Sequence, residues 1–198
     1  SITGVGILTF IAPSTSLSGA LGHEIIERNT GQKLEINGGK IYSSTVTGIT
    51  RSDIGKPGEK NARSNSSNIY GNIKENTKSG ICGNYKESLP NSKLYKVAKP
   101  EEIKPGTAKI LTVIKDNKVE EFDIKILKIN QKSGTKNILF EITDERLLEK
   151  TGGIVQGMSG SPIIQGDNII GAVNFVLVDA PEKGYGIFIT NMLEEAEN

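Results

Sequence analysis

The chain of 198 residues has one cysteine, one histidine and no tryptophan, and only 5% of its residues are aromatic. The single cysteine, Cys82, cannot form an internal disulfide, so we expect it to be a structural residue. One cysteine and one histidine cannot make a zinc site of the usual kind. We therefore expect no metal and no cofactor, and a core built from Ile, Val and Leu.

The sequence also lacks an excess of charge of either sign, because 24 Lys and Arg residues nearly balance 23 Asp and Glu residues, for a net charge of +1. Nucleic-acid-binding domains usually carry a basic stripe with interleaved aromatic residues, and the sequence has no such stripe. No apolar run approaches the ~20 residues that a membrane-spanning helix needs. The sequence thus predicts no nucleic-acid partner. Because it does not begin with Met, we expect these residues to be a domain cut from a longer chain, with any anchor or targeting segment upstream of them.

Short β-branched runs separated by turn signals dominate the chain. Strands are expected in the segments 4–13, 39–50, 106–130, 136–143, 162–178 and 184–190. Hairpin turns are expected at residues 116–118 and 166–168. Helices are expected only over 143–153, with Thr143 as the N-cap, and over 190–198. Many short strands and few helices predict an all-β barrel or sandwich.

The run GMSGSP around Ser159 indicates a candidate nucleophilic serine on a tight turn. A nucleophilic serine needs exposure on a tight turn, N–H groups directed at the developing oxyanion, and a base within reach. Gly157 permits a backbone conformation closed to residues with a Cβ, so the N–H groups of Gly157 and Ser159 are expected to form an oxyanion hole. Gly160 leaves room beside the hydroxyl, and Pro162 begins the next strand. The alternative interpretation is a glycine-rich turn with a solvated serine.

The base decides between these interpretations, and the chain has one histidine, His23, in the run SGALGHEII. A lone histidine is usually a surface or core residue, but the small residues before it leave space for a serine and a substrate. α/β-Hydrolases need a histidine after the serine, and subtilisin-like enzymes need an aspartate before the histidine. Neither is present, whereas the chymotrypsin order His, Asp, Ser fits.

That order belongs to an all-β fold. We therefore predict two antiparallel β-barrels of the chymotrypsin-like type with a C-terminal helix. Residues 1–100 would form the N-terminal lobe that carries His23. Residues 101–198 would form the C-terminal lobe that carries Ser159, and the two lobes together would make one peptidase domain.

Three stretches, GALGH, TDERLLEKTGGIVQGMSGSPIIQ and GAVNFVLV…GYGIFITNMLEEA, closely resemble the SpoIVB-type serine peptidases of spore-forming Firmicutes. The likeness covers most of the chain. It implies a serine endopeptidase that cleaves itself and a regulatory protein in the sporulation signalling pathway that activates sigma-K. It also implies an exported protein between the forespore and mother-cell membranes, with a membrane-associated N-terminal segment and a PDZ domain outside these residues.

The resemblance implies a role for three residues. Ser159 matches the nucleophile of the family, His23 matches its general base, and Asp144, fifteen positions before the serine, matches the implicated acid. From the residues alone the acid stays open. Asp53 has the spacing of an ordinary chymotrypsin-like acid but lies in a polar loop, and Asp144 would otherwise be a helix N-terminal aspartate stabilised by the helix dipole.

Substrate-binding residues are expected on the second lobe. Asn174, Phe175 and Val176 are expected to pair with an extended peptide by β-addition, and Gly153 and Ile154 are expected to line the side-chain pocket. No charged residue is evident at the floor of this pocket, so the preferred substrate side chain is open. The alternative function is a chymotrypsin-like domain that binds peptides with little or no cleavage. A barrel without a site is disfavoured because the histidine and the serine motif occur together.

Overall fold

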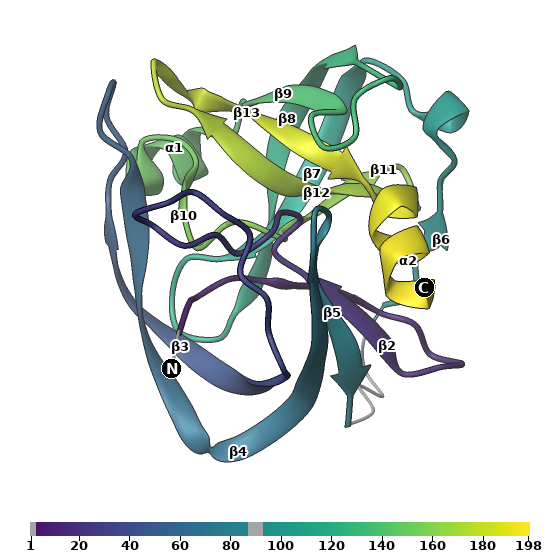
Figure 1. Cartoon of the computed structure of the whole chain (residues 1–198). Helices are drawn as coiled ribbons and strands as arrows, with labels where there is room; N and C mark the ends of the chain where they lie inside the picture. Colours follow the sequence, from purple (N-terminus) through teal and green to yellow (C-terminus); the bar gives the residue numbers. More distant parts are fainter. Residues whose placement is uncertain (1–2, 87–92) are drawn as a thin grey trace.

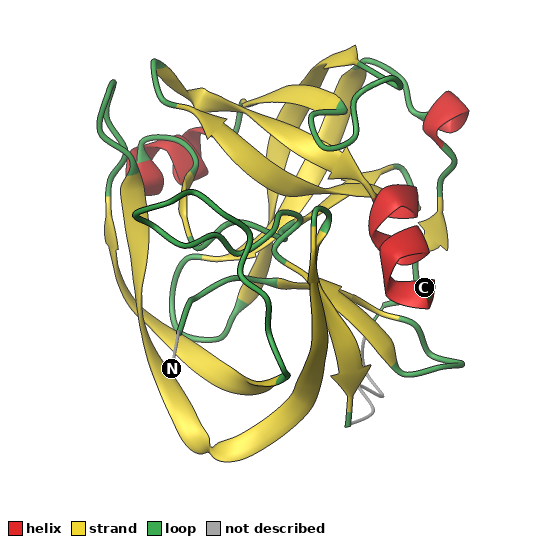
Figure 2. Ribbon diagram, in the orientation of Figure 1, coloured by secondary structure: helices red, strands yellow, loops and turns green. Residues whose placement is uncertain are grey.

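The computed structural model describes residues 3–86 and 93–198, and its strands form two sheets with the helices at their margins (Figure 1 and Figure 2). The first sheet has the order β1-β2-β5-β4-β10, and β3 pairs with β4. Its strands are β1 (Leu8–Ile11), β2 (Leu17–Ala20), β3 (Gly39–Thr50), β4 (Gly58–Thr77), β5 (Gly80–Tyr85) and β10 (Val155–Gln156). In Figure 1, β4 curves strongly along its length. This sheet is open, a half-barrel.

The second sheet closes on itself. Its order is β11-β7-β8-β9-β13-β12, and β11 also pairs with β12, while β6 adds to the outside of β12. The strands are β6 (Lys96–Val97), β7 (Gly106–Val113), β8 (Val119–Ile129), β9 (Ile138–Ile142), β11 (Pro162–Gln165), β12 (Asn168–Leu177) and β13 (Ala180–Phe188). The predicted all-β, two-barrel fold class with a C-terminal helix is confirmed, with a closed second barrel and a partly open first one.

The hydrophobic core lies mainly in the closed barrel. Alternate residues of its strands point inward, as the two-residue period of a strand requires. Fully buried side chains include Ile110, Phe122, Ile124, Ile138 and Phe140. The half-barrel contributes far fewer buried apolar side chains, so the closed barrel is the better-packed support for the residues that it carries.

In the described part of the chain, three short helices accompany the sheets: η1 (Pro100–Glu102), α1 (Glu145–Thr151) and α2 (Ile189–Glu197). The prediction of Thr143 as the N-cap of α1 was wrong. The N-cap is Asp144, whose carboxylate accepts the N–H groups of Arg146 and Leu147, because a carboxylate can bind two orphan donors of the first turn. Helix α2 buries Ile189 and Met192 and packs against β2 and β12.

Two short parallel strands join the halves of the chain. β10 pairs with β4 of the half-barrel, and β6 pairs with β12 of the closed barrel. Each half of the chain therefore adds a strand to the sheet of the other. The division into lobes at residue 100 stays a prediction.

Candidate active site

Ser159 and His23 meet between the two sheets. His23 follows β2 of the half-barrel, and Ser159 lies in the loop between β10 and β11, which leads into the closed barrel. The Nε2 atom of His23 is 2.9 Å from the Oγ atom of Ser159. This is the distance at which a base can take the serine proton.

Backbone contacts lock the serine loop against the histidine turn. The Ile7 N–H donates to the Ser159 carbonyl at 3.0 Å, and the Leu21 N–H donates to the Ile7 carbonyl at 3.4 Å. Thr9 Oγ1 donates to the Gly160 carbonyl at 2.7 Å. Gly160 has φ +92°, and a Cβ there would lie 2.3 Å from the Ile7 carbonyl oxygen and 2.7 Å from the Leu21 nitrogen. Glycine is required because the two loops approach so closely.

The predicted oxyanion donors, the N–H groups of Gly157 and Ser159, lie in a loop with the expected backbone conformation. Gly157 has φ +99°, in the region open mainly to glycine. The Met158 carbonyl accepts both the N–H of Ser161, at 2.9 Å, and its hydroxyl, at 2.6 Å. In the described part of the chain, the Ser159 N–H has no hydrogen-bond partner, so it is left to receive an oxyanion.

The hydrogen bond at the second ring nitrogen of His23, Nδ1, determines the tautomer of the imidazole. Nδ1 lies 3.0 Å from the backbone carbonyl of Glu24. A carbonyl oxygen only accepts hydrogen bonds, so Nδ1 carries the hydrogen and Nε2 is left as the acceptor toward Ser159. The Phe175 ring stacks on the imidazole, with centroids 5.9 Å apart and planes 20° apart. The Glu24 carbonyl carried no sequence signal, because any residue supplies the same backbone atom.

The predicted acids lie elsewhere. The Asp144 carboxylate accepts the N–H groups of Asp123, Arg146 and Leu147 at 3.1, 3.1 and 3.3 Å. The carboxylate of Asp53 accepts the N–H of the next residue, at 2.8 Å. Among the described residues, neither carboxylate is bonded to His23. The three backbone donors hold the Asp144 side chain at the start of α1, so the structure does not assemble the triad that the resemblance implies.

The family description SpoIVB peptidase S55 matches residues 1–193. The chain belongs to this family. It is therefore a serine peptidase, and its partners are protein substrates. A search of curated proteins gave no match. Among solved structures, the inactive form of a serine-to-alanine mutant of Rv3671c from M. tuberculosis H37Rv is 15% identical, with a TM-score of 0.44, over 75% of this chain and 76% of that chain.

In this S55 peptidase, the residues predicted to pair with an extended substrate lie in the C-terminal half of β12. Phe175 and Val176 pair with β13 on one side, and no described strand pairs with their other edge. Phe175 is 37% exposed. The Lys136 ammonium lies 5.3 Å from the centroid of its ring. Asn174 is buried, and its Nδ2 donates to the Thr135 carbonyl at 2.7 Å. An edge with an exposed aromatic side chain suits an extended peptide.

Gly153 and Ile154, the residues predicted to line the side-chain pocket, lie against the start of β13. The Ile154 N–H donates to the Pro181 carbonyl at 2.7 Å. Gly153 has φ +144°, and a Cβ there would lie 2.3 Å from the same carbonyl oxygen. Both residues are buried against β13. Their role in a side-chain pocket stays a prediction.

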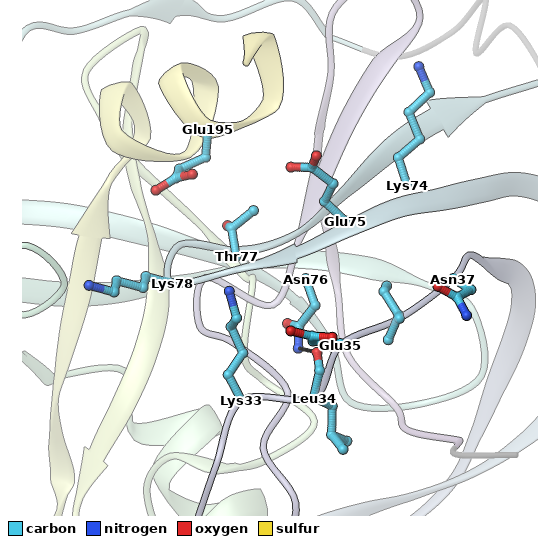
Figure 3. A pocket seen from close by; sticks show the side chains of 11 residues that line it. Lys33, Leu34, Glu35, Asn37, Lys74, Glu75, Asn76, Thr77, Lys78 and Glu195 are labelled. Carbon is cyan, nitrogen blue, oxygen red and sulfur yellow. Dashed lines mark hydrogen bonds between the residues drawn. The ribbon is translucent and has the colours of Figure 1, made fainter.

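A hollow of about 620 Å³ lies away from the His23–Ser159 contact, between the segment 33–37, β4 and α2 (Figure 3). Lysines and glutamates alternate around it, including Lys74, Glu75 and Glu195. Neither His23 nor Ser159 lines it. Its mixed charges favour no one class of ligand, so it is not a candidate for the substrate site.

Cys82 is a half-buried free thiol on β5, and burial raises its pKa, which lowers its reactivity at neutral pH. Within residues 3–86 and 93–198, no group of three or more His, Cys, Asp or Glu side chains is placed to hold a metal ion. No helix in the same ranges has the length and apolar character needed to cross a membrane.

Proposed function

We propose that Ser159 is the nucleophile and His23 the general base of this serine peptidase. The observation that carries the proposal is the 2.9 Å contact between His23 Nε2 and Ser159 Oγ. The 3.0 Å contact from Nδ1 to the Glu24 carbonyl supports it, because it leaves Nε2 unprotonated. Position and tautomer together are what general-base catalysis requires.

The reaction follows from this geometry. Ser159 Oγ forms a bond to the carbonyl carbon of the substrate while its proton passes to His23 Nε2. The N–H groups of Gly157 and Ser159 stabilise the oxyanion that forms. The carbon–nitrogen bond then breaks, and the departing amine takes the proton from Nε2. Water attacks the acyl-serine and gives its proton to Nε2, after which Ser159 regains the proton and the acid product leaves.

The substrate binds as an extended peptide beside Asn174, Phe175 and Val176. β-Addition aligns the main chain of the peptide and directs its reactive carbonyl toward Ser159. Gly153 and Ile154 line the pocket for the side chain before the cleaved bond. The free edge of β12 next to the dyad supports this assignment.

The resemblance supports a finer role. The domain cleaves itself and a regulatory protein in the sporulation signalling pathway that activates sigma-K. It acts after export, between the forespore and mother-cell membranes, and belongs to a membrane-associated protein with a PDZ domain. Mass spectrometry of the purified domain during incubation tests the self-cleavage, because Ser159→Ala should remove the cleaved species.

The second candidate function is a peptide-binding domain with little or no cleavage. The observation that favours it is that the described carboxylates do not reach Nδ1 of His23, since the aspartate of a triad stabilises the imidazolium. The acid is the point at which resemblance and geometry differ: the resemblance implies Asp144, whereas the geometry supports a dyad oriented by the Glu24 carbonyl.

A fluorophosphonate probe separates the two candidates, since it labels only an activated serine. We expect the wild-type domain to be labelled and both Ser159→Ala and His23→Ala to lose labelling, because the two residues act as one unit. Ser67→Ala, at an exposed serine on β4, is the matched control and should label like the wild type. Unchanged labelling of either active-site variant would contradict the dyad. An unlabelled wild type that still binds peptides would favour the second function.

A further inference from the structure

A lysine is buried behind the serine loop. Lys60, on β4, is only 7% exposed, and burial lowers its pKa to about 7. No ion pair reaches it within the described ranges. Its Nζ donates to Thr112 Oγ1 at 2.8 Å. A buried ammonium without a carboxylate is costly to the fold, which points to a function for this side chain.

Hydrogen bonds connect Lys60 to the serine loop through two buried hydroxyl groups. Thr112 on β7 is 1% exposed, and Ser161 is fully buried. Their hydroxyl oxygens lie 3.1 Å apart, and Ser161 Oγ lies 2.6 Å from the Met158 carbonyl oxygen. The four groups form a continuous chain from the ammonium to a backbone carbonyl.

The donors in this chain of hydrogen bonds all point the same way, from the Lys60 ammonium toward the Met158 carbonyl. The Met158 carbonyl only accepts, so the Ser161 hydroxyl donates to it, and the Thr112 hydroxyl is left to donate to Ser161. The protonated Lys60 has no acceptor and starts the chain by donating to Thr112. Each donor in such a chain polarises the next one. The ammonium therefore acts at a distance on the Met158 carbonyl.

The Met158 carbonyl and the Ser159 N–H belong to one peptide group. A hydrogen bond to the oxygen of a peptide group draws electrons from its nitrogen and makes its N–H a stronger donor. The Lys60 side chain also lies beside the second predicted oxyanion donor, since a Cβ at Gly157 would be 3.0 Å from the Lys60 Cβ. Lys60 is thus connected by hydrogen bonds to the peptide group of one donor of the proposed oxyanion hole, and its aliphatic stem packs beside the other.

We propose that Lys60 is a positioning residue for the oxyanion hole, acting on the Ser159 peptide group through Thr112 and Ser161. The inference rests on the proposed function of Ser159. Charge-assisted hydrogen bonds are roughly twice as strong as neutral ones, so the chain is strongest when Lys60 is protonated. Among the described residues, Lys60 pairs with Ile49 of β3, donates to Thr112 and packs beside Gly157, and none of these three neighbours is titratable.

The test is Lys60→Met, read as the rate of fluorophosphonate labelling at saturation and the probe concentration for half-maximal rate. Loss of one oxyanion donor costs ~10²–10³-fold, and weakening one should cost less, so we expect a saturating rate about 10-fold lower with the half-maximal concentration unchanged. The ratio of wild-type to variant rate should be largest below about pH 7 and shrink above it. This ratio cancels the titration of His23, which both proteins share.

Three further variants sharpen the test. Thr112→Val keeps Lys60 but breaks the chain, so it should lower the rate similarly, and the double variant should lose little more. Lys109→Met is the matched control, because Lys109 is half exposed and pairs with Glu121, and it should label like the wild type. Labelling of Ser159→Ala would overturn the proposed function instead.

Two results would overturn the inference alone. An unchanged saturating rate in Lys60→Met at every pH would show that the amine does not act on the oxyanion hole. A lowered rate with a ratio that does not vary with pH would assign Lys60 a merely structural role. In both cases a labelled wild type and an unlabelled Ser159→Ala would leave the proposed function intact.

Discussion

The imidazole of His23 is held at three places. Ser159 contacts Nε2, the Glu24 carbonyl contacts Nδ1, and Phe175 covers one face of the ring. In a triad, an aspartate both orients the ring and stabilises its positive charge. A carbonyl supplies the orientation and only a partial negative charge. The proposed dyad is therefore oriented for proton transfer, but the imidazolium would be less strongly stabilised than in a triad.

At the residue scale, Asp144 separates the two assignments of the acid. Asp144→Ala should lower the free energy of unfolding by about 1 kcal/mol, as loss of an N-cap does, and urea denaturation measures this. Asp144→Asn should keep most of the stability, because asparagine is also a good N-cap. Both variants should keep wild-type labelling, and so should Asp53→Asn.

A large loss of labelling rate in Asp144→Asn would contradict the expectation that Asp144 is only a helix cap. In a Ser-His-Asp triad, the change to asparagine lowers the rate ~10⁴-fold by favouring the wrong histidine tautomer. A loss of that size in Asp144→Asn, with unfolding unchanged, would assign the acid to Asp144, as the resemblance implies. The same loss in Asp53→Asn would assign it to Asp53.

At the scale of elements, the serine loop and the histidine turn are held together by main-chain contacts with the segment before β1. Gly160 is the point of closest approach, because a Cβ there would lie well inside van der Waals distance of two backbone atoms. Backbone atoms cannot rotate aside as side chains can. The His23–Ser159 distance therefore depends on the absence of a side chain at this position.

Gly160→Ala should separate the two loops and lower the labelling rate ~10²-fold or more, since a displacement of about 1 Å can cost that much. The matched control is Gly166→Ala, which also has positive φ, +61°, but has open space around the added Cβ. The control should lose some stability and keep its labelling rate. Equal rates in the two variants would contradict the interlocking of the loops.

At the scale of the whole molecule, helix α2 ties the half-barrel to the closed barrel. Met192 is 3% exposed and packs with Ala172 of β12 and Ile187 of β13, and Phe10 of β1 packs against this cluster. The two side chains of the proposed dyad, His23 and Ser159, are carried by opposite sheets, so contacts that join the sheets also maintain the distance between them.

Met192→Ala should lower the free energy of unfolding by ~2–5 kcal/mol, as loss of a buried methionine side chain does. The substitution leaves a cavity between the two sheets, so amide hydrogen exchange should also accelerate in β1 and β2. Glu194→Ala, at an exposed position of the same helix, is the matched control and should change neither measurement. Faster exchange in β7 and β8 instead would show that α2 supports the closed barrel alone.

The sequence by itself determined the all-β class, the lone histidine and the glycine-flanked serine. Period-two runs and turn residues are local signals, and the chain order His before Ser excludes other hydrolase folds. Only the tertiary structure brought His23 to Ser159, gave Nδ1 a backbone partner and buried Lys60 behind the loop. Asp144 has the same surroundings in the sequence whether it is an acid or a cap. Burial and contacts between distant residues arise only when the sheets pack, so no local pattern carries them.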